Sequence, residues 1–285
     1  MRKRGTAQRS PYVNVNILTE KNGTMRLFDT HAHYNDGRFE SEYPGGAEGA
    51  IQDSFGAGII GFINCGTDPK SSRESLALAD KYKNVYAACG LHPEDAEGFS
   101  DTIEDTVEEI ASLLSHPKAV ALGEIGLDYH WDIDRDIQHR AFDVQLSAAK
   151  SLGIPVIVHD RDAHGKTLEM IKQHPGVIGV MHGYSGSAET ALEYLRLGWY
   201  ISFGGPVTYK NAENVRNALR SVPTDRLLIE TDCPYLPPVP YRGKVNCSAY
   251  MFHTLEAMAA ARGENEEKLA AATVKNAENL FGIGL

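Results

Sequence analysis

A chain of 285 residues is long enough to bury a large core, either as one big domain or as two ordinary ones. Its apolar content of 42% and charged content of 23% are typical of a soluble globular protein, and no apolar run approaches the length that spans a membrane. The four cysteines show no paired spacing, which favours a reduced, cytoplasmic setting over a disulfide-bonded one.

Residues 1–24 differ in charge from the rest of the chain. They carry five of the 28 basic residues and one of the 38 acidic ones, and no apolar stretch of a secretory signal follows Arg2-Lys3-Arg4. We interpret them as a leader or a disordered extension. Residues 25–285 then hold 23 basic and 37 acidic residues, a formal net charge of −14. Such an acidic body disfavours a broad nucleic-acid footprint but allows a small site where bound metal ions supply positive charge.

Short apolar runs alternate with segments of helical periodicity along residues 25–285. Eight runs are predicted as buried strands, over residues 26–33, 59–64, 85–89, 119–124, 155–159, 177–182, 199–203 and 226–232. Helices are predicted over residues 49–57, 68–81, 103–114, 133–152, 163–173, 188–197, 212–221, 249–261, 266–272 and 273–281. Asp68-Pro69 supplies a capping carboxylate and a first-turn proline for the second of these helices.

The alternation of strands and helices predicts right-handed β-α-β crossovers and a parallel sheet. Eight such units fit a single closed (β/α)8 TIM barrel with extra C-terminal helices. A doubly wound open sheet is the alternative architecture. No internal repeat, low-complexity tract or linker interrupts residues 25–285, so we predict one barrel domain there.

Two histidines at the end of the first predicted strand are the first candidate ligands. In Asp29-Thr30-His31-Ala32-His33 the imidazoles are two residues apart, so on a strand both point to the same face. Two neutral imidazoles that converge in this way form half of a transition-metal site. Taken alone, such a pair is more often an accident or a hydrogen-bonded surface pair than a metal site.

Further ligand-type residues end later strands, and the carboxyl ends of barrel strands meet at one mouth. The full set at these ends is His31, His33, Glu124, His159, His182 and Asp232. Four imidazoles and two carboxylates suit two divalent ions, with Glu124 placed to bridge them. Two ions about 3.5–4 Å apart can stabilise both the attacking and the leaving oxygen of a displacement.

The segments around these residues resemble the TatD-type metal-dependent deoxyribonucleases of the amidohydrolase-like barrel superfamily. The resemblance runs from Met25 to the C-terminus in the order of the family's motifs, which makes it highly specific. The matching segments are Phe28-Asp29-Thr30-His31-Ala32-His33, Gly90-Leu91-His92-Pro93, Gly123-Glu124-Ile125-Gly126-Leu127-Asp128-Tyr129, Val158-His159-Asp160-Arg161-Asp162-Ala163, His182-Gly183-Tyr184-Ser185-Gly186, Glu230-Thr231-Asp232-Cys233-Pro234-Tyr235-Leu236, Tyr241-Arg242-Gly243-Lys244 and Asn276-Ala277-Glu278-Asn279-Leu280-Phe281-Gly282.

The resemblance implies a divalent-metal-dependent phosphodiesterase that trims DNA, in some members RNA, from the 3′ end. The expected cofactors are two divalent ions (Mg²⁺, Mn²⁺ or Zn²⁺), and the expected partners are DNA ends or short oligonucleotides, with no membrane and no obligate protein partner. Carried over residue by residue, one ion would be held by His31, His33, Glu124 and Asp232, and the other by Glu124, His159 and His182.

Catalytic and substrate-binding roles follow from the same resemblance. Glu124 and Asp232 are the expected catalytic residues, and Asp232 beside a metal ion would accept the proton of the attacking water. Arg161 is the expected phosphate contact, because a planar guanidinium matches phosphate oxygens at two points. His92 is expected to contact substrate, with a hydrogen bond that orders its loop as the alternative.

The sequence departs from the family after the Arg-Gly-Lys loop, where Asn246-Cys247-Ser248 replaces the usual Asn-Glu-Pro. How this loop is held is therefore open at the level of sequence. Tyr129, Tyr184 and Tyr209 on the mouth loops are expected either to stack on bases or to pack at the rim. Cysteines at strand ends are expected to act as small apolar packing residues.

Two rival functions were weighed against a nuclease. A metal-dependent amidohydrolase or esterase acting on a small C–N or C–O substrate is the alternative enzyme. Related enzymes commonly bridge their metals with a carboxylated lysine on the fourth strand, where this chain has Glu124. A non-catalytic metal-binding or adaptor protein would not need all six ligand positions intact.

Overall fold

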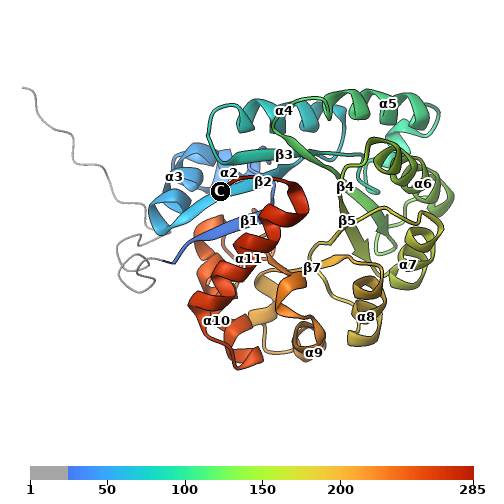
Figure 1. The fold of residues 1–285 in the computed structure, drawn as a ribbon. Helices are drawn as coiled ribbons and strands as arrows, with labels where there is room; N and C mark the ends of the chain where they lie inside the picture. Colours follow the sequence, from blue (N-terminus) through green and yellow to red (C-terminus); the bar gives the residue numbers. More distant parts are fainter. Residues whose placement is uncertain (1–24) are drawn as a thin grey trace, which may run out of the picture.

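Eight parallel strands follow one another in chain order around a barrel, with helices on its outside (Figure 1). The structure is a computed structural model that describes residues 25–285, so the leader predicted over 1–24 lies outside the described residues. The strands are β1 (Leu27–Ala32), β2 (Ile59–Cys65), β3 (Val85–Cys89), β4 (Ala119–Asp128), β5 (Val156–Arg161), β6 (Gly179–Met181), β7 (Tyr200–Phe203) and β8 (Leu227–Ile229). The predicted (β/α)8 barrel is confirmed.

Helices connect every pair of successive strands, and two more follow the last strand. They are α2 (Arg38–Glu42), α3 (Gly46–Ala57), α4 (Pro69–Ala79), α5 (Ile103–Leu113), α6 (Arg135–Leu152), α7 (His164–Gln173), α8 (Ala188–Arg196), α9 (Glu213–Ser221), α10 (Met251–Arg262) and α11 (Glu266–Phe281). The predicted cap of α4 is confirmed, because the Asp68 side chain accepts a hydrogen bond from the Ser71 N–H at 2.6 Å. Within residues 25–285, none of the helices combines the length and apolar character that a membrane crossing requires.

Four elements differ clearly from the sequence prediction. The break predicted after residue 272 is wrong: α11 continues through it, because no glycine or proline interrupts this segment and its buried face keeps helical spacing. The short helix α2 was not predicted. Strand β4 continues to Asp128, four residues past the predicted end, whereas β8 stops at Ile229 and leaves Asp232 in the loop after it.

The interior of the barrel is filled by a cluster of apolar side chains that range in size from alanine to phenylalanine and tyrosine. Every strand contributes at least one member, among them Ala88 of β3, Ala121 of β4 and Ile157 of β5. Ala277 and Phe281 of α11 belong to the same cluster, so α11 packs against one end of the barrel. A larger cluster packs the outer faces of the strands against the helices. The polar side chains of the predicted site therefore lie at the opposite end of the barrel, where the strands have their carboxyl ends.

The seam between β1 and β8 is closed by backbone groups of the predicted ligands themselves. The Asp232 N–H donates to the His31 carbonyl at 3.0 Å, and the His33 N–H donates to the Cys233 carbonyl at 2.8 Å. Asp232 has a positive φ of 57°, a strained conformation for a residue with a side chain, and these bonds help to hold it there. The backbone hydrogen bonds that close the barrel therefore also place three of the candidate ligands.

Asp29 reinforces this seam with a fully buried carboxylate. Its Oδ1 accepts hydrogen bonds from the backbone N–H groups of His31 (3.2 Å) and Thr231 (3.0 Å). Its Oδ2 accepts from the hydroxyls of Thr231 and Ser248, both at 2.6 Å. One side chain therefore joins β1, the segment after β8 and the loop that leads to α10.

We expect Asp29→Ala to lower the free energy of unfolding by about 3 kcal/mol, because it leaves several buried donors without an acceptor. Chemical denaturation of the variant measures this loss. Asp225→Ala, which removes an exposed carboxylate elsewhere on the chain, should change stability by no more than about 0.5 kcal/mol. Equal stability of the two variants would contradict the role of Asp29 in the seam.

Candidate metal centre

Glu124 lies at the centre of the cluster because of an irregularity in β4. The register between β4 and β5 shifts between Leu122 and Ile125, and the Glu124 N–H donates to the Gly66 carbonyl at the end of β2, at 3.0 Å. The backbones beside Glu124 approach one another so closely that glycine is required at two positions, Gly90 and Gly126. A Cβ on Gly90 would lie 2.6–2.8 Å from the backbone of Gly123 and Glu124, and one on Gly126 (φ 138°) would lie 2.0 Å from the His159 carbonyl oxygen. The glycines of these motifs therefore let three neighbouring strands converge on one carboxylate.

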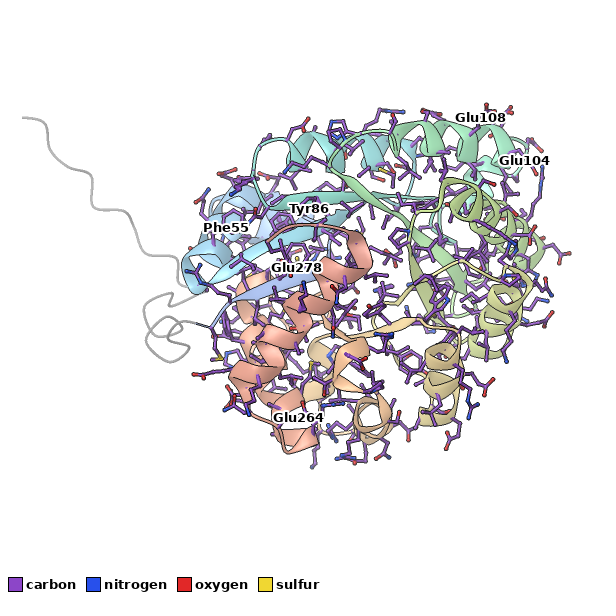
Figure 2. All side chains as sticks on the ribbon, viewed as in Figure 1. Phe55, Tyr86, Glu104, Glu108, Glu264 and Glu278 are labelled. Atoms are coloured by element: carbon purple, nitrogen blue, oxygen red, sulfur yellow. The ribbon has the colours of Figure 1, made fainter. Side chains whose placement is uncertain are left out.

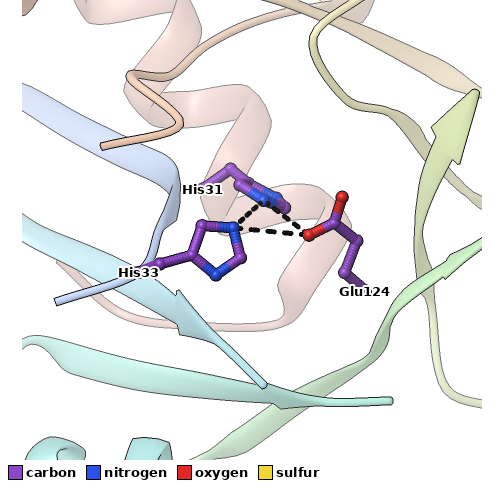
Figure 3. A group of neighbouring side chains, drawn as sticks. All are labelled: His31, His33 and Glu124. Atoms are coloured by element: carbon purple, nitrogen blue, oxygen red, sulfur yellow. Dashed lines mark hydrogen bonds and ion pairs between the residues drawn. The ribbon is translucent and has the colours of Figure 1, made fainter. Parts of the chain in front are cut away.

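One oxygen of Glu124 faces His31 of β1 and His33, which follows directly after β1 (Figure 3). Glu124 Oε2 lies 3.2 Å from His31 Nε2 and 3.3 Å from His33 Nε2, and the two nitrogens are 2.9 Å apart. Asp232 Oδ1 completes the group at 3.4 Å from His33 Nε2 and 3.7 Å from His31 Nε2. Two imidazole nitrogens and two carboxylate oxygens thus surround one point.

The other oxygen of Glu124 faces a second set of imidazoles. Glu124 Oε1 lies 3.0 Å from His159 Nδ1 and 2.7 Å from His182 Nε2, and these two nitrogens are 3.2 Å apart. The rings of His31 and His182 stack with their centres 3.9 Å apart, so the two sets are in contact. The structure therefore brings all six predicted ligands together and divides them between the two oxygens of Glu124.

Hydrogen bonds behind the imidazoles fix which ring nitrogen faces Glu124. His33 Nδ1 lies 3.0 Å from the Cys65 carbonyl oxygen, an acceptor only, so this nitrogen carries a proton and donates. His159 Nε2 donates in the same way to Asp128 Oδ2 at 2.9 Å. In the neutral ring the opposite nitrogen then has a lone pair directed at the site, the arrangement common to histidine ligands of metals.

Glu230 provides the matching bond for the second set. His182 Nδ1 lies 3.4 Å from Glu230 Oε1, which also accepts from the Gly183 N–H at 2.6 Å. Neither Asp128 nor Glu230 was predicted as part of the site. Asp128 lies four residues after Glu124, and Glu230 lies two residues before Asp232. This closeness to a predicted ligand in the same motif is the sequence feature that could have pointed to them.

His92 has the opposite arrangement. Its Nδ1 accepts a hydrogen bond from the Glu94 N–H at 3.1 Å, so in the neutral ring the proton lies on Nε2. That nitrogen is 3.4 Å from Glu124 Oε1. His92 therefore presents a donor to the site where the other rings present acceptors. The loop-ordering hydrogen bond that was the alternative expectation for His92 is present, and contact of His92 with substrate stays a prediction.

Charge in the cluster is balanced by protons when no cation is bound. Burial lowers the pKa of His33, but hydrogen bonds to Asp232 and Glu124 outweigh it and raise the pKa to about 10. Burial likewise lowers the pKa of His159, and hydrogen bonds to Asp128 and Glu124 raise it to about 9. Burial raises the pKa of Glu124, but the facing imidazoles hold it well below its ordinary value.

The donor set fits divalent ions. Imidazole nitrogens and carboxylate oxygens at this spacing suit Zn²⁺, Mn²⁺ or similar ions, and the bonds behind the rings supply the required tautomers. Cys65 Sγ lies 3.4 Å from His31 Nδ1, away from the converging nitrogens, and burial keeps the pKa of this thiol well above its ordinary value. Its packing against His31 agrees with the role expected for strand-end cysteines.

Arg161 lies at the last position of β5 with an exposed side chain, outside the cluster. Its guanidinium carbon is 5.9 Å from the ring centre of Trp131. Of the tyrosines expected at the mouth, Tyr184 is buried, and the rings of Tyr129 and Tyr209 are covered by the guanidinium groups of neighbouring arginines. Rim packing is therefore the observed arrangement for all three tyrosines.

The loop that departs from the family pattern is held by hydrogen bonds. The Asn246 amide donates to the carbonyls of Thr231 (2.9 Å) and Tyr235 (2.7 Å). The Ser248 hydroxyl donates to Asp29, and the buried Cys247 thiol lies 3.9 Å from the Tyr43 hydroxyl. Ser248 thus ties the departing loop to the seam beside the site.

Comparison with known proteins identifies close relatives over almost the whole chain. A sequence profile of the family described as TatD related DNase matches residues 28–282. The uncharacterized metal-dependent hydrolase YabD of Bacillus subtilis (strain 168) is 39% identical over 260 residues, which cover 90% of this chain and 99% of YabD. The 3′-5′ ssDNA/RNA exonuclease TatD of Citrobacter rodentium (strain ICC168) is 35% identical over 269 residues, 91% of this chain and 99% of its own. The crystal structure of YjjV, a TatD homologue from Escherichia coli K12, superimposes with a TM-score of 0.83 at 33% identity and covers 92% of this chain and all of its own.

Metal uptake should release protons. At about pH 7.5, His33 and His159 of the metal-free protein carry protons on the nitrogens that face Glu124, because their pKa values are about 10 and about 9. An imidazole ligand must be neutral, so binding of Zn²⁺ displaces these protons, and affinity falls as the pH is lowered. Calorimetry in two buffers of different ionisation enthalpy measures the release. His174→Gln, which changes a histidine bonded to Asp143 on the surface, should leave it unchanged. A binding heat that does not depend on the buffer would contradict the assignment.

Proposed function

This chain belongs to the TatD-related DNase family of metal-dependent hydrolases, and we propose that it hydrolyses phosphodiester bonds of DNA from the 3′ end. The observation that carries the proposal is the division of one buried carboxylate, Glu124, between two groups of imidazoles. Two ions bridged by a carboxylate suit displacement at phosphorus, where an attacking and a leaving oxygen both need stabilisation. The Citrobacter relative is named a 3′-5′ exonuclease of single-stranded DNA and RNA, which supports this substrate class and makes RNA the second substrate to test.

We assign the ligands by the two sides of Glu124. The first ion would be held by His31, His33, Glu124 and Asp232, and the second by Glu124, His159 and His182. When bound, the ions supply positive charge beside the scissile phosphate and lower the pKa of water. Imidazole-rich sites favour Zn²⁺, whereas Mg²⁺ and Mn²⁺ exchange more readily and prefer oxygen.

Asp232 is placed to accept the proton of the attacking water. Its side chain is 19% exposed, against 4% for Glu124, so it lies between the buried cluster and the open mouth. Burial raises its pKa, but the hydrogen bond to His33 and the charge of His31 outweigh burial and lower it. Asp232 is therefore ionised near neutral pH, the state that a general base requires.

Arg161 and His92 are the two side chains that we expect to donate hydrogen bonds to the phosphate oxygens. Arg161 extends from the end of β5, two residues beyond His159, with its guanidinium exposed at the mouth. His92 presents the protonated Nε2 beside Glu124 Oε1. A phosphate bound between them would have its charge matched by the guanidinium and would receive a hydrogen bond from the His92 imidazole.

We also propose a cytoplasmic location. All four cysteines are buried and free, as expected for a protein kept in a reducing compartment.

We expect Glu124→Gln to lower the rate of phosphodiester cleavage about 100-fold or more with the fold retained, because the amide keeps the size of the side chain and loses its charge. The assay uses metal-reconstituted protein with single- and double-stranded oligonucleotides labelled at the 3′ or the 5′ end. Glu108→Gln is the matched control, since Figure 2 places Glu108 on the outer side of α5.

The label that is released first distinguishes 3′-directed from 5′-directed trimming. Activity of Glu124→Gln equal to that of Glu108→Gln would contradict the bridging role. Failure of the wild-type protein to cleave any of the oligonucleotides would contradict the proposed function.

The salt dependence of binding should be shallow. With a net charge of −14 over residues 25–285, phosphates distant from the site meet repulsion, so about one to three contacts are expected. Each neutralised single-strand phosphate contributes about 0.7 to the slope of log affinity against log salt. Arg161→Ala should flatten the slope by about one contact, whereas Lys150→Ala, at the far end of α6, should not. A slope equivalent to about six contacts at fixed divalent concentration would reveal an extended binding track.

A further inference from the structure

An exposed tryptophan stands beside the candidate metal centre in the loop between β4 and α6. Trp131 is 51% exposed, the largest exposed fraction among the large aromatic side chains of residues 25–285. It lines an open hollow of about 590 Å³ whose walls are residues 129–136. An exposed indole offers a flat aromatic face on which another ring can stack.

The loop that carries Trp131 is anchored to the site through Asp128. Asp128 Oδ1 accepts hydrogen bonds from the N–H groups of His130 (2.8 Å) and Trp131 (3.4 Å). Its Oδ2 accepts the bond from His159 described above. One buried carboxylate therefore fixes the backbone of the loop and the orientation of a candidate ligand. The position of Trp131 relative to the site is set before any substrate arrives.

The charges around the hollow favour a neutral aromatic group over a run of phosphates. The Arg161 guanidinium is 5.9 Å from the Trp131 ring centre, which places the expected phosphate contact beside the indole. The walls of the hollow hold Asp132, Asp134 and Asp136 against one guanidinium, Arg135, so their net negative charge would repel further phosphates. A nucleobase is not repelled in this way, because it is uncharged, and its flat ring can lie against the indole.

Among Trp131, Tyr235 and Tyr129, the Trp131 ring is the most accessible, because the Arg161 guanidinium lies over it at the longer distance of 5.9 Å. The Tyr235 ring is covered by the Arg38 guanidinium at 3.8 Å, and the Tyr129 ring by Arg135 at 4.2 Å. His130 meets Trp131 at 83°, and within residues 25–285 no aromatic ring stacks in parallel on the indole.

We propose that Trp131 is the stacking platform for one unpaired nucleobase, that of the nucleotide whose phosphate Arg161 contacts. This inference rests on the proposed function and names a base subsite within it. A stacked base restricts entry to single-stranded ends, because a paired base has both faces covered by its neighbours. Stacking is tolerant of sequence, so the subsite selects for strandedness rather than for a particular base.

The first test compares the wild-type full-length protein with Trp131→Ala and Trp131→Phe. Each protein is assayed on a short single-stranded oligonucleotide and on the same oligonucleotide with an abasic residue at its 3′ end. Base stacking on an aromatic ring corresponds to about a 5- to 100-fold effect. Trp131→Ala should raise KM by about that factor with kcat almost unchanged, and Trp131→Phe should retain most of the affinity. On the abasic substrate, Trp131→Ala and the wild type should perform alike.

Leu152→Ala is the matched control, because it removes another exposed apolar side chain, 52% exposed, at the end of α6 remote from the loop. Its KM should equal that of the wild type. An equal loss of affinity for the intact and the abasic substrate on Trp131→Ala would overturn the proposal, since the loss would then not depend on a base.

Fluorescence provides a readout that does not require cleavage. The chain has two tryptophans, and Trp199 is fully buried with its N–H bonded to the Val177 carbonyl at 3.0 Å. Quenching by a thymidine tetranucleotide, recorded by stopped flow before the first turnover, therefore reports on Trp131 and should vanish in Trp131→Phe.

The two readouts separate the base subsite from the proposed function. Cleavage without quenching of Trp131 would overturn the subsite alone. Quenching without cleavage of any oligonucleotide would support the subsite and overturn the proposed function. Absence of both would overturn both.

Discussion

The site depends on one electrostatic constraint: the carboxylate of Glu124 is buried, and positive charge must lie on both of its sides. Two groups of imidazoles meet this requirement, one at each oxygen. Without cations, protons on the rings neutralise the carboxylate, which is why the pKa values of His33 and His159 are raised. A metal ion bound at the candidate site would therefore compete with protons for the same positions, which links metal binding to the burial of one acid.

The barrel holds these residues around Glu124 through the hydrogen bonds of the β1–β8 seam and through glycines that let the strands approach closely. His31, His33 and Asp232 are placed by the backbone bonds that join β1 to the segment after β8, and Asp29 reinforces that junction. Gly126 allows β4 to approach the His159 backbone. Asp128 then links His159 to the loop of Trp131, so the ligand cluster and the proposed base subsite form one rigid unit.

Much of this arrangement could be predicted from the sequence, because ligand-type residues at strand ends have a position that strand periodicity defines. The eight strands follow from the apolar runs, and the convergence of the six residues on one mouth follows from that rule. The register irregularity that centres Glu124 within β4, and the loop that holds Asp232 beyond β8, do not follow from periodicity. Asp128 and Glu230 could not be placed in the same way, since their role depends on which ring nitrogen they contact. Trp131 was missed because exposure of a loop side chain depends on its neighbours: Arg135 covers Tyr129 but leaves the indole open.

The central claim is that Glu124 bridges two ions, and anomalous diffraction from crystals of the protein loaded with Mn²⁺ or Zn²⁺ tests it most directly. The account predicts two peaks about 3.5–4 Å apart, one in contact with Glu124 Oε2, His31 and His33, the other with Oε1, His159 and His182. A single peak, or two peaks of which either lacks contact with Glu124, would contradict it.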